Sequence, residues 1–146
     1  MNSENFINLG MKQNFKPESD NKILYGEVNT PFSLIKEMLD IFPNEMFSNP
    51  KLKWLDPAAG CGYFPMVLYN LLMEGLREEI KEPILRKKHI LENMIYMCEI
   101  NEKNIITLKS IFGDKAQIHN YDFLSTNISN FVSNEQKFDV IIGNPP

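Results

Sequence analysis

The segment "KLKWLDPAAGCGYF", residues 51–64, decides the fold because it joins an apolar strand to a helix through a glycine-containing loop. We expect a strand over 51–55 and a loop over 56–64. The apolar spacing after the loop predicts a helix from Pro65 to about Ile80, which Pro83 ends. A strand, loop and helix in this order form the opening unit of an α/β fold.

The rest of the chain repeats this alternation on both sides of the segment. The further expected elements are a helix over 32–42, preceded by Pro31 and capped by Thr30, a helix over 84–92, a strand over 94–99, a helix over 101–112 ended by Gly113, and strands over 116–120 and 138–143. Alternating strands and helices imply parallel strands joined by right-handed crossovers. The sequence therefore predicts a partial parallel sheet of about four strands flanked by helices.

Composition indicates the size of the folded unit and which ligands this chain can bind by itself. The chain has 146 residues, 43% of them hydrophobic, which suits one globular unit. A net charge of −4 argues that this stretch alone does not hold a nucleic acid, so another segment would have to supply a basic surface. Residues 1–22 are polar and are expected to form a leader segment.

Cysteine usage and hydropathy point to a soluble cytoplasmic protein. Cys61 and Cys98 lack the spacing of metal ligands, so we expect no metal site and a reduced, cytosolic setting. The N-terminal residues contain no apolar signal core, and no run of apolar residues is long enough to cross a membrane. We therefore expect no membrane partner.

Three strand ends carry residues that suit a nucleotide-type ligand. Gly60 and Gly62 let the backbone approach a ligand closely, although a glycine turn without a ligand is the plainer reading of that loop alone. Glu99 ends the next strand, and a carboxylate can accept hydrogen bonds from two adjacent ribose hydroxyls. Asp122 and Phe123 follow the third strand and place an acceptor beside an apolar ring, which suits adenine.

The closing segment "FDVIIGNPP" reads as a strand buried on both faces that delivers Asn144 to the ligand edge of the sheet. Asn144 precedes a proline and is therefore held extended. Pro145 and Pro146 have no N–H, so the loop presents oxygen acceptors and no backbone donors there. We expect this rigid turn to accept hydrogen bonds from an amino group and to orient that group for reaction.

Taken in order, the motifs "GEVNTP", "DPAAGCGYF", "CEIN", "YDFL" and "GNPP" resemble those of the amino-methyltransferases that use S-adenosylmethionine. The resemblance is greatest to the γ-group of adenine-N6 DNA methyltransferases of restriction-modification systems, and it covers residues 23–146. It implies a Rossmann-like methyltransferase fold. It also implies a cofactor site made of Thr30, Asp56, Pro57, Ala58, Gly60, Gly62, Phe64, Glu99, Ile100, Asp122 and Phe123.

The resemblance assigns parts of the cofactor to particular residues. Thr30, Asp56 and Ala58 would contact its methionine part, and Glu99 would bind the ribose. The cofactor's adenine would pack on Ile100.

The same resemblance assigns the remaining roles at the site. Asp122, beside Phe123, would accept a hydrogen bond from the amino group of the cofactor's adenine. Asn144, Pro145 and Pro146 would form the catalytic turn, which holds the amine of a target adenine flipped out of the DNA duplex.

The resemblance also sets expectations about completeness. The family continues "NPP" with Tyr or Phe, whereas this chain stops one residue short. We expect residues 23–146 to be the N-terminal part of a catalytic domain, without a target-recognition domain, inactive alone and with an uncovered sheet edge at the fourth strand. Two alternatives stay open: methylation of a glutamine side chain or an RNA base, and a non-catalytic module that binds S-adenosylmethionine.

Overall fold

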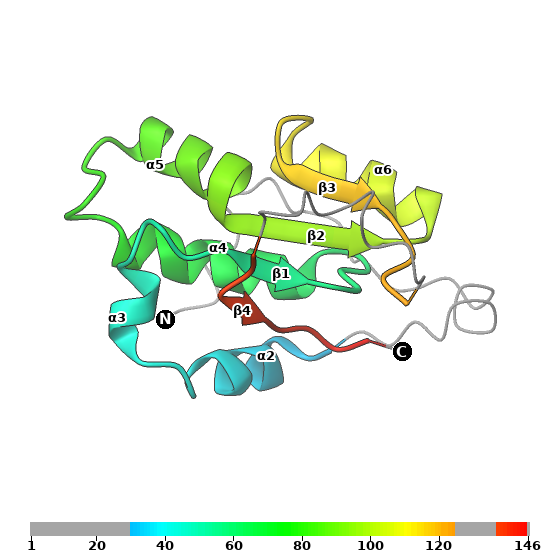
Figure 1. Cartoon of the computed structure of the whole chain (residues 1–146), viewed down its shortest axis with the longest axis horizontal. Coiled ribbons are helices and arrows are strands. Elements are labelled where there is room, and N and C mark those ends of the chain that lie inside the picture. Colours follow the sequence, from blue (N-terminus) through cyan, green and yellow to red (C-terminus); the bar gives the residue numbers. More distant parts are fainter. Residues whose placement is uncertain (1–29, 125–136, 146) are drawn as a thin grey trace.

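A four-stranded parallel sheet with the order β3-β2-β1-β4 forms the centre of the molecule (Figure 1). The computed structural model describes residues 30–124 and 137–145. The strands are β1 (Trp54–Asp56), β2 (Ile95–Glu99), β3 (Gln117–Asn120) and β4 (Val140–Ile141). The helices are α2 (Phe32–Leu39), α3 (Asn44–Phe47), α4 (Tyr63–Gly75), α5 (Pro83–His89) and α6 (Glu102–Phe112), with a π-helical turn η2 (Ile90–Met94). The predicted α/β fold is confirmed.

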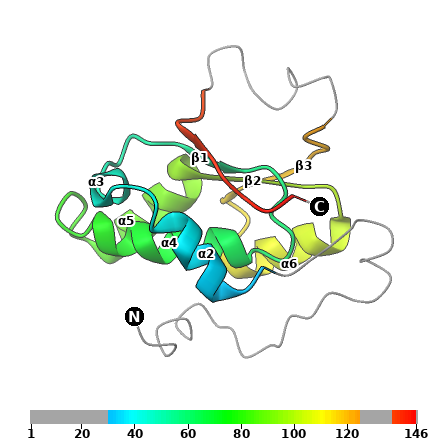
Figure 2. The same ribbon diagram turned by 90° about the horizontal axis from the view of Figure 1, so that it is seen from below.

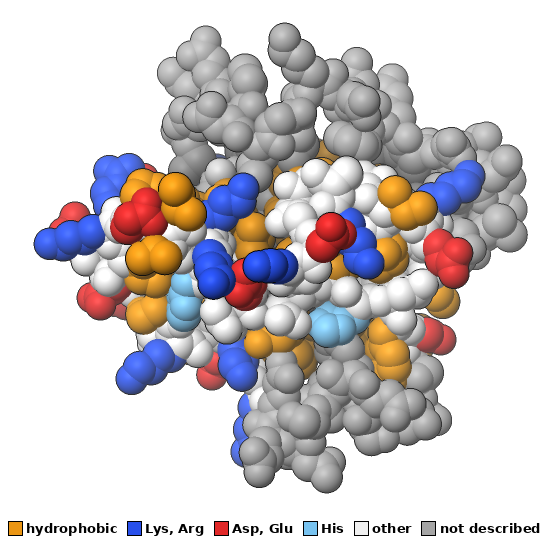
Figure 3. Space-filling model, turned by 90° about the horizontal axis from the view of Figure 1, so that it is seen from above, with side chains coloured by type: hydrophobic (Ala, Val, Ile, Leu, Met, Phe, Trp, Pro, Cys, Tyr) orange, Lys and Arg blue, Asp and Glu red, His pale blue; other side chains and the backbone are white. Residues whose placement is uncertain are grey.

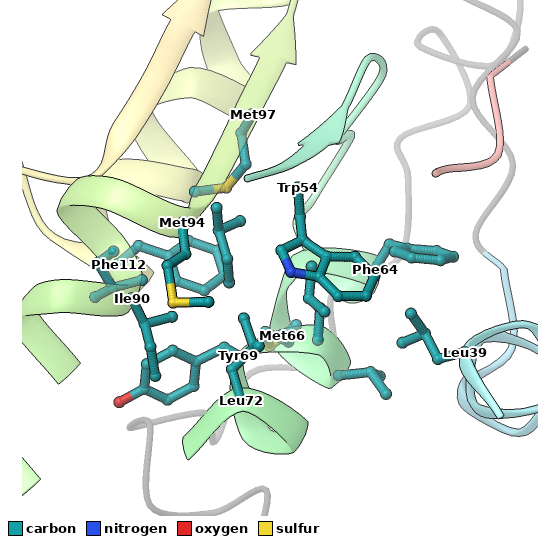
Figure 4. Packing of buried hydrophobic residues seen from close by; sticks show 14 of the residues in the cluster. Leu39, Trp54, Phe64, Met66, Tyr69, Leu72, Ile90, Met94, Met97 and Phe112 are labelled. Carbon is teal, nitrogen blue, oxygen red and sulfur yellow. The ribbon is translucent and has the colours of Figure 1, made fainter. Parts of the chain in front are cut away.

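Helices α2, α4, α5 and α6 lie on one face of the sheet (Figure 2). Every residue of β1 and β2 is buried, either against these helices or on the opposite face of the sheet, because each of the two strands has a neighbouring strand on both sides. Trp54 of β1 and Met97 of β2 point toward Met66 and Leu72 of α4 (Figure 4). This packing fixes α4, and with it the loop that leads into α4, against the sheet.

Trp54 anchors the connection between the first helices and the sheet. Its side chain is fully buried, stacks on Phe47 with the ring centroids 5.4 Å apart, and meets Phe42 edge-on at 5.5 Å. Aromatic pairs in these geometries add to the stabilisation from burial alone. The carbonyl of Phe47 also lies directly against Gly75, where there is no room for a side chain.

The opposite face of the sheet carries a smaller apolar cluster. Leu55, Tyr96 and Cys98 are buried there, with Phe123 and Phe138 packed against them. The rings of Tyr96 and Phe138 meet edge-on at 5.1 Å. Among the residues that the structure describes, no helix covers this face (Figure 2).

Several helix boundaries differ from the prediction. α2 ends at Leu39 and not at residue 42, and α5 spans Pro83–His89 and not 84–92, because the π-helical turn η2 follows it. Pro31, and not Thr30, is the N-cap of α2, and no side chain caps that end. α4 begins at Tyr63 and ends at Gly75, not near Ile80, because glycine is a poor helix former and here meets the backbone of α3. The prediction that Gly113 ends α6 is confirmed, since Gly113 is the C-cap with φ of 90°.

The fourth strand is shorter and more exposed than predicted. β4 spans two residues and, among the described strands, pairs only with β1, so it lies at the edge of the described sheet. Val140 is buried, but Ile141 is 59% exposed, so the expectation of burial on both faces is wrong. The apolar run alone does not distinguish a central strand from an edge strand. The predicted edge position of this strand is confirmed.

No helix within the described parts of the chain has the length and apolar character needed to span a membrane. The predicted leader over residues 1–22 lies outside the described residues.

Candidate active site at the carboxyl edge of the sheet

The parallel strands bring four polar residues to one edge. In Figure 1 the strand arrows point to the same side of the sheet. Asp56 ends β1, Glu99 ends β2, and Asp122 is the second residue after β3. Asn144 is the third residue after β4. Ligands of open parallel sheets bind outside this edge, so these residues define the candidate site.

The loop between β1 and α4 is held against the end of β2. The Ala59 N–H donates to the Cys98 carbonyl at 2.9 Å, and the Gly60 N–H donates to Glu99 Oε2 at 2.7 Å. Gly60 has φ of 54° and Gly62 has φ of 89°, which glycine adopts at little cost. The loop conformation is therefore fixed by backbone donors and by the next strand.

The two loop glycines have different surroundings. A Cβ on Gly60 would meet no atom of the described residues within 4 Å, so these residues leave the space over this part of the loop open. A Cβ on Gly62 would lie 2.8 Å from Leu108 and 3.1 Å from Phe112 of α6. Gly60 is thus placed for close approach of a ligand, whereas Gly62 has a packing reason to be glycine.

Glu99 is a buried carboxylate with spare acceptor capacity. Only 7% of the residue is exposed. Oε2 accepts the Gly60 N–H and Oε1 accepts the Asn101 N–H, each at 2.7 Å. A carboxylate has about four lone-pair sites, so each oxygen can accept one more hydrogen bond. Glu99 is therefore oriented by the backbone and still able to bind a pair of hydroxyls.

Asp56 lies at the centre of the edge and is nearly fully buried. Its Oδ1 accepts the Ala58 N–H at 3.1 Å. Burial raises the pKa of Asp56 to about 7; the Ala58 hydrogen bond opposes this shift, and the nearby charge of Glu99 adds to it. Asp56 is consequently poised between its neutral and charged forms near neutral pH, where a cation beside it favours ionisation.

Cys98 lies behind these acids and is not a nucleophile. Burial raises the pKa of its thiol to about 12, with the charges of Asp56 and Glu99 adding to the effect. A thiol with this pKa stays protonated at neutral pH and is a weak nucleophile.

The loop after β4 is hydrogen-bonded to the end of β1 and packs against it. The Ile142 N–H donates to the Leu55 carbonyl at 2.9 Å. The Cα of Gly143 lies so close to Asp56 that a Cβ there would collide with Oδ1 and would lie 3.3 Å from Pro57 Cδ. β1 therefore positions both the glycine loop and the turn that follows β4.

Asn144 is exposed and makes one long-range contact. Its Nδ2 donates to Thr30 Oγ1 at 3.0 Å, across 114 positions of sequence. Pro145 is exposed as well, and Pro146 lies outside the described residues. The side-chain contact of Asn144 leaves its Oδ1 as the acceptor that the turn presents.

The remaining predicted residues are dispersed. Ile100 is 50% exposed beside Glu99, as an apolar platform would be. Asp122 is exposed, with Oδ1 accepting the Leu124 N–H at 3.0 Å. Phe123 packs onto the Leu55 cluster on the opposite face, and Phe64 is buried in the main core.

Three contacts at the candidate site were not predicted from the sequence. They are the Thr30–Asn144 hydrogen bond, the Asp56–Gly143 contact and the role of Asn101 in holding Glu99. Asn101 had a visible signal, because Asn before a helix is typical of an N-cap, and its Oδ1 does accept the Lys103 N–H. The first two contacts join segments distant in sequence and had no such signal.

The described residues hold no cluster of three or more His, Cys, Asp or Glu side chains that could bind a metal. On the side of the molecule that carries α5 and the β3 edge, Lys and Arg side chains are interspersed with Asp and Glu (Figure 3). That side therefore presents no continuous basic surface among the described residues.

A parallel α/β sheet with a glycine loop after β1, an acid ending β2 and an Asn-Pro turn after β4 defines a Rossmann-like methyltransferase. The chain belongs to the N-6 DNA methylase family, whose sequence profile matches residues 12–146.

A relative gives the same indication over a shorter stretch. A protein of Mycoplasma pneumoniae (strain ATCC 29342 / M129 / Subtype 1), described as an uncharacterized adenine-specific methylase, is 41% identical over 73 residues. The match covers 48% of this chain and 17% of the relative. The chain thus matches less than a fifth of that protein's length.

Proposed function

We propose that this chain forms the cofactor- and amine-binding part of an enzyme that transfers a methyl group from S-adenosylmethionine to N6 of adenine in DNA. The observation that carries the proposal is the convergence of Asp56, Glu99 and Asn144 at one sheet edge, with Asp56 in contact with the turn that holds Asn144. Family membership and the adenine-specific relative support the same activity.

The residues present fit the cofactor. Glu99 has the acceptor capacity for two ribose hydroxyls, and Ile100 offers an exposed apolar side chain next to it for the adenine ring. Open space over Gly60 admits close approach to the loop backbone. Asp56, with its raised pKa, would ionise beside the cationic methionine part. When bound, the cofactor supplies an electrophilic methyl group.

The turn after β4 fits the amine of the target. Asn144 Oδ1 and the carbonyl of Pro145 would accept the two N–H groups of an exocyclic amine, which orients that amine without a general base. Neither proline has an N–H that would repel the amine. An adenine that reaches this turn must leave the duplex, at a cost of a few kcal/mol in lost stacking and pairing.

The rest of the enzyme would supply the DNA-binding surface. A net charge of −4 on this chain does not favour a polyanion. We therefore assign target recognition to parts of a longer protein, and we propose a restriction-modification system as its setting.

The direct test is methyl transfer with isotopically labelled cofactor. The chain, alone and within its full-length parent, is given unmethylated DNA, total RNA or protein extract as acceptor, and the products are digested and separated. We expect label in N6-methyldeoxyadenosine from the parent. Label in glutamine or in an RNA base with none in DNA would overturn the proposed substrate.

A matched pair of variants tests the assigned turn in the parent protein. Asn144→Ala removes an acceptor that orients the amine, and we expect a loss of rate of about a hundredfold or more. Asn49→Ala removes another exposed asparagine, in the segment that precedes β1, and should leave the rate unchanged. Equal rates for the two variants would exclude Asn144 from catalysis.

A further inference from the structure

We infer that Thr30 is a positioning residue for the catalytic turn, because its hydroxyl holds the Asn144 carboxamide in the orientation that presents Oδ1 to the target amine. The inference rests on the function proposed above. Its structural basis is the 3.0 Å hydrogen bond from Asn144 Nδ2 to Thr30 Oγ1. This bond gives Thr30 a different role from the two predicted for it, which were a helix cap from its sequence position and a cofactor contact from the family resemblance.

The orientation of the amide decides whether the turn can bind an amine. A carboxamide has an acceptor edge and a donor edge, and rotation by 180° about the Cβ–Cγ bond exchanges them. With Oδ1 outward, the turn presents hydrogen-bond acceptors to the N–H groups of the amine. With Nδ2 outward, a donor of the turn would face the donors of the amine. A hydroxyl that accepts from Nδ2 selects the first arrangement.

Thr30 is held well enough to act in this way. It precedes Pro31, which restricts it to extended backbone conformations. α2 follows at once and is anchored by the fully buried Ile35 and Leu39. Phe32, in the first turn of α2, meets the ring of Tyr63 edge-on at 5.0 Å, which ties α2 to the start of α4.

Asn144 is held from the other side. The Ile142 N–H donates to the Leu55 carbonyl, Gly143 packs against Asp56 and Pro57, and Pro145 limits the backbone of Asn144 itself. Both partners of the hydrogen bond are therefore fixed by separate parts of the fold. The backbone leaves the exposed side chain free to rotate, and the hydrogen bond to Thr30 restricts that rotation.

The test observes the Asn144 side-chain NH₂ by ¹⁵N NMR in the whole chain, with the signals assigned from their loss in Asn144→Asp. Thr30→Val keeps the shape of the side chain and removes the acceptor, whereas Thr30→Ser keeps the hydroxyl. Thr107→Val is the matched control, because Thr107 is half-buried like Thr30 and its hydroxyl donates to the Lys103 carbonyl of its own helix. Backbone spectra of all variants verify the fold.

We expect Thr30→Val to shift the Asn144 NH₂ signals and to speed their hydrogen exchange about 3- to 10-fold. Thr30→Ser and Thr107→Val should resemble the unmodified chain. Unchanged Asn144 signals in Thr30→Val would overturn the inference, since they would mean that the NH₂ does not bond to Thr30. This readout needs no activity, so it distinguishes a failure of the inference from a failure of the proposed function.

A second readout separates positioning from cofactor binding. In the active parent, Thr30→Val should lower kcat about 3- to 10-fold and leave the KM for the cofactor within twofold. A raised KM with unchanged kcat would overturn the inference and assign Thr30 to the cofactor instead.

Discussion

Asp56→Asn should make the protein more stable at alkaline pH, although it alters the proposed site. Asn has the same shape as Asp and keeps an oxygen for the Ala58 N–H, but it cannot ionise. Burial raises the pKa of Asp56 from an ordinary 3.8 to about 7. The folded state therefore binds this proton more tightly than the unfolded state does.

The sign and size of the effect follow from that difference. Below pH 3.8 Asp56 is protonated in both states and contributes no pH dependence. As the pH rises toward 7, only the unfolded state loses the proton, so the free energy of unfolding falls and then levels off. Each pH unit between the two pKa values is equivalent to about 1.4 kcal/mol, which gives about 4 kcal/mol at pH 8.

Urea unfolding at pH 5 and pH 8 measures the effect, followed by the fluorescence of Trp54, the one tryptophan of the chain. We expect Asp56→Asn to raise the free energy of unfolding by about 1 to 2 kcal/mol at pH 5 and by about 4 kcal/mol at pH 8, relative to the unmodified chain. The exposed Asp114→Asn is the matched control and should change stability by less than about 0.5 kcal/mol. Equal effects of Asp56→Asn at the two pH values would refute the reasoning.

Two further predictions concern glycines. Gly143→Ala should lower the free energy of unfolding by about 1 to 3 kcal/mol, because the added methyl group meets Asp56. In an Asp56→Ala background the same substitution should cost less. Equal costs in the two backgrounds would show that the contact is absent. Gly62→Ala should cost more than Gly60→Ala in urea unfolding, because both have positive φ but only Gly62 lies against Leu108; the reverse order would contradict the assigned packing.

The elements with the clearest local signals were predicted from the sequence. β2 was found because its apolar run is bounded by Glu99, and the end of α6 because Gly113 closes the helix. The end of α4 was missed because it depends on the contact of Gly75 with the backbone of Phe47, which no local pattern encodes.

The positions of three candidate residues at the sheet edge were predicted, but their connections were not. Because parallel strands bring their carboxyl ends to one edge, Asp56, Glu99 and Asn144 were correctly placed there. The contacts that join Asp56 to Gly143 and Thr30 to Asn144 depend on how distant segments pack, and the spacing of residues along the chain does not reveal them.

Calorimetric titration of S-adenosylmethionine into this chain tests the central claim most directly. We predict saturable binding that Glu99→Ala weakens about 10- to 150-fold, because a carboxylate that bonds to the ribose hydroxyls contributes about 1.5 to 3 kcal/mol. The control Glu102→Ala, an exposed acid in the first turn of α6, should bind as the unmodified chain does. No binding by a demonstrably folded chain, or equal affinity of Glu99→Ala and the unmodified chain, would contradict the account.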